Sequence, residues 1–135
     1  MAQLRAEKEQ RERDFDEGFQ LVEDLTYEAH DFKGTIVDVE ARQDRLQALV
    51  PQADRAFELL QHHPAAYARA QPLLNKATIF ITLGQHASAL AALRQDDDIF
   101  VKADAAKAEG LTSEDDHRFW VQVVNIMEYT YLASN

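Results

Sequence analysis

Residues 15–50, FDEGFQLVEDLTYEAHDFKGTIVDVEARQDRLQALV, decide the fold of this chain. Apolar side chains recur in this stretch in a seven-residue register that has two apolar positions in each repeat. The first position holds Phe15, Val22, Ala29, Ile36, Gln43 and Val50, and the second holds Gly18, Leu25, Phe32, Val39 and Leu46. Both positions fall on one face of an α-helix. The stretch therefore predicts a helix with a continuous apolar seam.

The seam continues through Gly34 without a change of register. A glycine inside a helix costs about 1 kcal/mol relative to alanine, which a long helix can tolerate. We therefore expect one uninterrupted helix from Gln3 to Val50. At about 1.5 Å per residue such a helix is roughly 70 Å long, which exceeds the width of a domain of this size. Its seam should be too long for the rest of the chain to cover.

The length and composition fit one folded domain. The chain has 135 residues, of which 46% are hydrophobic, and this is enough to bury an apolar core. We expect a single helical domain over residues 1–135, with a charged helical extension over 1–14 and a bundle over 15–135. The charged extension has two interpretations, a solvated helix end or a stalk that pairs with another chain.

Prolines divide the middle of the chain into shorter helices. Pro51 should end the long helix and begin a second one over Gln52–Gln61, because its fixed φ suits a first helical turn. Pro64 should begin a third helical stretch that continues to Leu93. Pro72 lies inside that stretch, where we expect a kink or a break.

Two more helices are expected toward the C-terminus. Asp96, Asp97 and Asp98 would supply an N-cap for a short helix over Ile99–Glu109, which Gly110 ends. A capping box over residues 112–115 begins the last helix. That helix should turn seven apolar side chains inward: Phe119, Trp120, Val123, Val124, Met127, Tyr131 and Leu132. The predicted fold is all-α, a helical bundle with one long N-terminal helix and three to five shorter helices.

The charge balance and the residue inventory exclude several classes of partner. With 24 Asp and Glu against 14 Lys and Arg, the net charge of −10 would repel a nucleic acid backbone. The absence of cysteine removes disulfides, thiolate metal sites and a cysteine nucleophile. The longest apolar stretch, Ala77–Leu83, is much shorter than a bilayer span, so we expect no direct membrane insertion by this chain.

The histidines offer few candidates for chemistry. Glu114 and His117 have the Glu-x-x-His spacing of helical metal sites, although the same residues also suit helix capping. His62 and His63 precede Pro64 at a helix end, where an imidazolium would interact favourably with the carbonyl terminus. The sequence has no Gly-rich phosphate loop, no Gly-x-Ser-x-Gly elbow and no His-Glu-x-x-His motif. We therefore expect no catalytic or cofactor-binding residue, no cofactor and no enzymatic activity.

One part of the chain resembles a known family. Between Val39 and Leu93 a helix ends before a proline and a Leu-rich helix follows, with Phe57, His63, Pro64, Leu74 and Leu83 in comparable places. This region resembles the helical part of bacterial 5-bromo-4-chloroindolyl phosphate hydrolysis proteins and the related toxic-anion (tellurite) resistance proteins. Residues 109–131 look like the end of small bacterial proteins that carry an N-terminal membrane helix. The resemblances imply an all-α bacterial protein, cytoplasmic or tethered to a membrane, and supply no catalytic residues.

The expected function is that of a non-enzymatic structural or protein-interaction module. A seam that the chain cannot cover itself would pair with a second copy or with a partner helix. The expected contacts are Phe15, Phe19, Val22, Leu25 and Phe32. The alternative is a bundle that binds a metal or small ligand in toxic-ion resistance, with Glu114 and His117 among its ligands. A phosphate-ester hydrolase is a third hypothesis, which comes from the family name alone.

Overall fold

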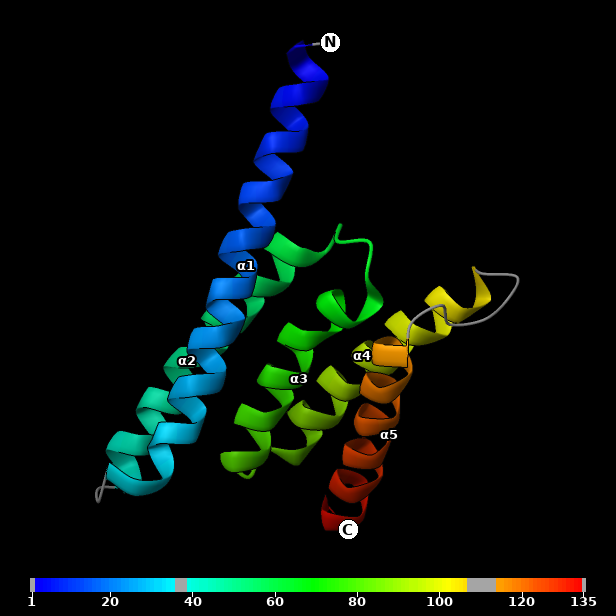
Figure 1. Cartoon of the computed structure of the whole chain (residues 1–135). Coiled ribbons are helices and arrows are strands. Elements are labelled where there is room, and N and C mark those ends of the chain that lie inside the picture. The colour runs from blue at the N-terminus through cyan, green and yellow to red at the C-terminus, as the bar shows by residue number, and fades with distance from the viewer. Residues whose placement is uncertain (1, 36–38, 107–113, 135) are drawn as a thin grey trace.

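The computed structural model describes residues 2–35, 39–106 and 114–134, with the side chains of all of these except 29–35 and 39. Five α-helices make up this part of the chain: α1 (Ala2–Thr35), α2 (Val39–Leu60), α3 (Ala66–Thr82), α4 (His86–Ala105) and α5 (Glu114–Ser134). The described residues include no strand. The prediction of an all-α bundle with a long N-terminal helix and three to five shorter ones is therefore confirmed (Figure 1).

The expected single helix from Gln3 to Val50 is wrong. Helix α1 ends at Thr35, directly after Gly34, and α2 returns along α1 in the opposite direction (Figure 1). The two halves of the predicted seam cover each other. Their shared apolar cluster holds Leu25 of α1 with Leu46, Leu49 and Ala53 of α2, and Ile79 of α3 joins them. A hairpin satisfies the seven-residue register as well as a rod does, because each arm supplies the apolar partner of the other.

Prolines do not end helices where we expected them to. Helix α2 continues through Pro51, and α3 continues through the buried Pro72, so neither the predicted stop nor a break occurs. A proline inside a helix removes the bond to the carbonyl four residues earlier. At Pro51 this carbonyl belongs to Gln47, and both residues are exposed, so water can replace the missing bond.

Gly84 ends α3 and divides the third stretch that the sequence predicted. Its φ of 76° lies in the left-handed region, which favours glycine. Gln85 N–H donates to the Phe80 carbonyl at 2.8 Å, and Gly84 N–H donates to the Ile81 carbonyl at 3.0 Å. These two bonds form a Schellman motif, which satisfies carbonyls at the end of the helix. Helix α4 then begins at His86.

The three aspartates that we expected to cap a short fourth helix lie inside α4 instead. The predicted helix over Ile99–Glu109 is therefore wrong. Asp98 pairs with Lys102 at 2.9 Å, and Asp97 accepts a bond from Trp120 of α5 at 2.7 Å. Asp96 is completely buried. The sequence pattern could not separate a cap from a mid-helix position, because an acidic run is compatible with both.

A second apolar cluster lies among α3, α4 and α5. It contains Ala66, Ala70, Leu74 and Ala77 of α3, Ala92, Leu93 and Phe100 of α4, and Val123 of α5. Phe119, Trp120 and Met127 pack against it as expected. Three other residues that we expected inside, Val124, Tyr131 and Leu132, are exposed. Helix α5 contacts only α4 and α3, so one side of it is covered and the opposite side is not.

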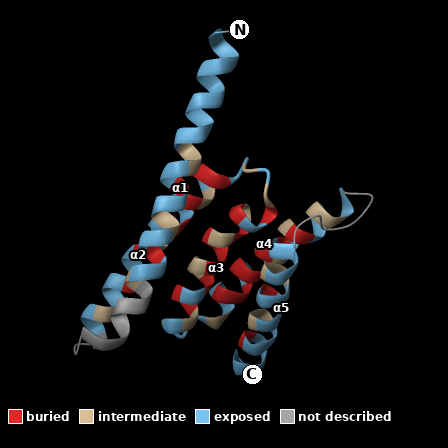
Figure 2. Ribbon diagram, in the orientation of Figure 1, coloured by how far each residue is buried: buried red, intermediate tan, exposed pale blue. Residues whose placement is uncertain are grey.

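The helices form two layers. Each helix packs against the next in sequence, and further contacts join α1 to α3 and α3 to α5. The odd-numbered helices thus form one layer with α3 at its centre, and α2 and α4 lie behind it, as in stacked helical hairpins. Buried residues concentrate between the layers, whereas the N-terminal part of α1 is exposed along its length (Figure 2). None of the described helices has the length and apolar character needed to cross a bilayer.

Candidate interaction surface

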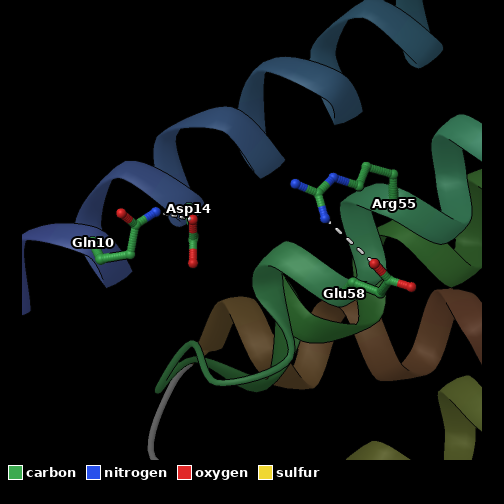
Figure 3. Close-up of polar contacts among 4 residues, drawn as sticks. All are labelled: Gln10, Asp14, Arg55 and Glu58. Atoms are coloured by element: carbon green, nitrogen blue, oxygen red, sulfur yellow. Dashed lines mark hydrogen bonds and ion pairs between the residues drawn. The ribbon is translucent and has the colours of Figure 1, made fainter. Parts of the chain in front are cut away.

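The N-terminal part of α1 extends beyond the bundle. Residues 2–13 are all exposed, and in Figure 1 this part of the helix has no neighbour. Polar side chains of the extension bond along their own helix, where Gln10 Nε2 donates to Asp14 Oδ1 at 2.9 Å. On the neighbouring end of α2, Arg55 Nη1 likewise pairs with Glu58 Oε2 of its own helix at 3.4 Å (Figure 3). The extension is therefore a surface that other parts of the described chain leave uncovered.

The path of α1 is set by a close approach to α2 at Gly18. A Cβ added at Gly18 would lie 2.7 Å from Leu60 Cγ and 3.3 Å from Leu59 Cβ. Leu60 is fully buried, so it has no free space into which it could move. Glycine at this position lets the end of α2 reach α1 directly. Beyond this crossing α2 ends, and α1 continues alone.

Two phenylalanines sit where the extension joins the bundle, and both contact His63. The ring centroids of Phe15 and His63 are 4.8 Å apart, and those of Phe19 and His63 are 5.3 Å apart in an edge-to-face arrangement. Phe15 is half-buried, whereas 38% of Phe19 is exposed. The His63 ring therefore anchors the base of the extension and leaves part of Phe19 accessible.

His63 does not act as the charged helix cap that we expected. Its Nδ1 accepts a bond from Ala65 N–H at 3.0 Å, which requires a neutral ring nitrogen. Arg69 Nη1 donates to the His63 carbonyl at 2.7 Å. Burial lowers the pKa of His63, and the Arg69 charge lowers it further. The hypothesis of a charged imidazolium is wrong at this position, because the ring nitrogen accepts a bond from Ala65 and the ring lies near the positive charge of Arg69.

The predicted contacts fall into three groups. Phe15 and Phe19 lie at the surface near His63, and Val22 is half-buried one turn further along α1. Leu25 is only 1% exposed, since α2 and α3 of the same chain cover it, so its predicted role at an intermolecular seam is wrong. The side chain of Phe32 lies outside the residues that the structure describes.

Four apolar residues of α1 that are exposed or half-buried lie in one line. Leu4, Phe15, Phe19 and Val22 are separated by eleven, four and three residues, which places them on one side of the helix. We call this set the α1 stripe. Leu4 is 67% exposed. The stripe begins on the extension and ends beside α3, where Asn75 Nδ2 donates to the Val22 carbonyl at 3.5 Å.

The polar side of α3 was missed by the sequence analysis. It holds Tyr67, Gln71, Asn75, Thr78 and Thr82, which recur at intervals of four and three residues. Gln71 Nε2 donates to Asn75 Oδ1 at 2.9 Å, so the amides hold each other in place beside α1. This spacing on an otherwise apolar helix was a usable signal.

Asp116 is a second residue that the sequence analysis missed. It lies in the first turn of α5 and is buried, and its Oδ1 accepts a bond from Tyr67 N–H at 3.0 Å. Tyr67 is the second residue of α3, whose own N-cap residue, Ala65, supplies no side-chain bond. The carboxylate thus caps α3 from a distant part of the chain. The predicted local capping box over residues 112–115 lies partly outside the described residues.

The metal candidates are not brought together with other ligands. Glu114 Oε1 pairs with Arg118 Nη2 at 2.8 Å, and His117 is exposed. Over the ranges that the structure describes, no three His, Cys, Asp or Glu side chains form a group that could hold a metal ion. The geometry therefore gives no support to the metal-bundle hypothesis.

Comparison of the chain with protein-family models, curated proteins and solved structures gives no match. The resemblance of residues 39–93 to the 5-bromo-4-chloroindolyl phosphate hydrolysis and tellurite resistance proteins therefore stays a prediction. Function has to be argued from the surface of the molecule itself.

Proposed function

We propose that this chain is a non-enzymatic helical module that self-associates through the α1 stripe. The observation that carries the proposal is the extension of α1: every residue from 2 to 13 is exposed, and Phe19 at its base is partly accessible. The partner we propose is a second copy of the chain. A partner helix from another protein would use the same side of α1.

The energetics of an isolated helix support a partner. A helix of about a dozen residues is marginally stable in water without packing, because nucleation is costly and each added residue contributes little. The extension continues a helix that the bundle already nucleates, so it can form. Packing it against another helix would add the stabilisation that solvent does not provide.

Charge also favours the extension as the contact. Residues 2–14 hold four basic and four acidic side chains: Arg5, Lys8, Arg11 and Arg13 with Glu7, Glu9, Glu12 and Asp14. The segment is therefore neutral, although the whole chain carries −10. Two copies of an acidic molecule repel each other over most of their surfaces. Along the extension this repulsion is absent, and opposite charges can pair between helices.

The stripe itself has a suitable composition for this contact. Lys8 and Arg11 lie on the same side of α1 between Leu4 and Phe15. Their aliphatic stems can cover a neighbouring apolar side chain while the charged ends reach acidic groups. A second α1 lying along this side would bury Leu4 and the open part of Phe19.

Sedimentation equilibrium at several micromolar concentrations tests the proposal. We expect a dimer for the natural sequence and a monomer for the double variant Leu4→Ser with Phe19→Ser, because both exposed apolar contacts are lost. Tyr27→Ser is the matched control, since Tyr27 is a large exposed residue on another side of α1. It should leave the dimer unchanged. A monomeric natural protein, or a double variant that dimerises equally well, would contradict the proposal.

A further inference from the structure

Asp96 lies on the side of α4 that carries the apolar cluster among α3, α4 and α5. Its side chain has no exposed area. Ala92 and Leu93 lie one turn before it on α4, and Phe100 lies one turn after it, and all three belong to the cluster. Helical spacing places Asp96 on the same side of α4 as these residues. A carboxyl group therefore occupies a position where every neighbour on its helix face is apolar.

The carboxyl group has no bonding partner. Neither of its oxygens has a hydrogen-bond partner among the described residues. The basic groups of α3 are engaged elsewhere: Arg69 donates to the carbonyls of His63 and Pro64, and Lys76 pairs with Asp54 of α2 at 2.7 Å. No cation on α3 therefore compensates a charge at Asp96.

The other neighbouring helices supply no compensating charge either. Lys102 of α4 pairs with Asp98, and Arg118 of α5 pairs with Glu114. Arg94 and His117 are exposed, and His86 is half-buried at the start of α4. Two acidic groups lie on these helices instead. Asp97 directly follows Asp96 in α4, and the buried Asp116 shares the inner side of α5 with Val123.

An ionised carboxylate in such a place is strongly disfavoured. Removing it from water costs several kcal/mol, and no partner among the described residues offsets that cost. The neutral form loses much less on burial. The structure therefore requires a protonated Asp96 for α5 to close on α4 and α3.

We propose that Asp96 is a pH-sensitive switch, whose neutral carboxyl allows the α4–α5 contact to close and whose ionisation releases α5. Helix α5 can separate without disturbing the contacts among α1, α2 and α3, because among the described helices it contacts α4 and α3 alone. The cluster of Leu25, Leu46, Leu49, Ala53 and Ile79 does not involve α5, so it stays intact when α5 leaves. The switch acts independently of association through α1.

The direction of the pH response follows from linkage. Burial, together with the smaller effect of the neighbouring Asp97 charge, raises the pKa of Asp96 from 3.8 to about 8. The closed state therefore holds a proton that the open state releases between these two pH values. The stability of the closed state is greatest at acidic pH and declines as the pH rises toward 8. Over that interval the equilibrium constant for opening grows by about tenfold per pH unit at most.

The chain carries its own reporter of this event. Its one tryptophan, Trp120, donates from Nε1 to Asp97 Oδ1 at 2.7 Å and stacks on Phe100 with ring centroids 5.9 Å apart. Release of α5 removes both contacts and exposes the indole to water. Tryptophan emission therefore reports the α4–α5 contact directly.

The test is a titration of the full chain from pH 5 to pH 9, followed by tryptophan emission and by amide hydrogen exchange. We expect a red shift that grows as the pH rises toward 8 and levels off above it, with faster exchange in α5 after correction for the intrinsic rate. Amides of α2 should remain protected. Asp96→Asn should abolish the shift because it cannot ionise, and Asp98→Asn, an exposed aspartate on the same helix, should retain it.

A second variant guards against a folding defect in the first. Asp96→Leu keeps the branching at Cγ and the number of side-chain heavy atoms and has no polar atom, so it should stay closed over the whole pH range. The proposal is overturned if either Asp96 variant, once folded, shows the same pH-dependent shift as the natural sequence. It is also overturned if α2 and α5 lose protection together, because the transition is then global unfolding.

Discussion

At the scale of single residues, two buried aspartates show how surroundings decide what a carboxyl group does. Asp116 accepts the Tyr67 N–H at the start of α3, where the helix dipole favours a negative charge. Asp96 has apolar neighbours one turn before and after it on its helix, and no described residue bonds to its carboxyl group. The first fixes one helix end to another, and the second is tolerated only as a neutral group.

Replacing Asp116 should destabilise the fold measurably. Asp116→Ala leaves Tyr67 N–H without its acceptor and should lower the free energy of unfolding by about 1–2 kcal/mol, the usual effect of losing a helix cap. Urea denaturation followed by circular dichroism measures this. Asp115→Ala removes the neighbouring, exposed carboxylate and should change stability little. Equal effects of the two substitutions would argue against capping.

At the scale of helices, the turn between α3 and α4 depends on one backbone conformation. Gly84→Ala places a Cβ on a residue with a φ of 76°, which costs about 1–2 kcal/mol for an L-residue. No atom lies within 4 Å of that added Cβ, so backbone strain is the sole cause. Thermal unfolding should show a lower midpoint for Gly84→Ala and a smaller decrease for Gly84→Asn, which tolerates positive φ better. A larger decrease for Asn would contradict this explanation.

Helix content was predictable from the sequence, but helix ends were not. The register over residues 15–50 correctly identified which side of each helix is apolar. It could not say what covers that side, so a hairpin with Leu25 against Leu46 and Leu49 gave the same pattern as a rod. The predicted helix end at Pro51 was wrong because the Gln47 carbonyl, which loses its intrahelical bond there, belongs to an exposed residue and can bond to water instead.

The candidate surface was predictable only in part, for a similar reason. Phe15 belongs to the predicted seam and Phe19 follows the seam position Gly18, and both phenylalanines lie at the base of the extension. Their contact with His63 joins residues far apart in sequence, which periodicity does not reveal. The same holds for Asp96, whose position inside α4 depends on where that helix begins.

At the scale of the whole molecule, the extension of α1 and the bundle should be energetically separate. A chain that lacks residues 2–13 loses only exposed side chains. Its free energy of unfolding at low protein concentration should stay within about 0.5 kcal/mol of the original, as is usual for surface changes. Its mass in solution should nevertheless be that of a monomer. A marked loss of stability would show that the bundle depends on the extension.

The division of the interior into two apolar clusters has a consequence for synthesis of the protein. All members of the first cluster, and the residues packed on it, precede residue 84. The second cluster needs residues as late as Met127. Because domains begin to fold from the N-terminus as they leave the ribosome, the first three helices can collapse into a stable nucleus during translation. The last two then assemble on a template that already exists.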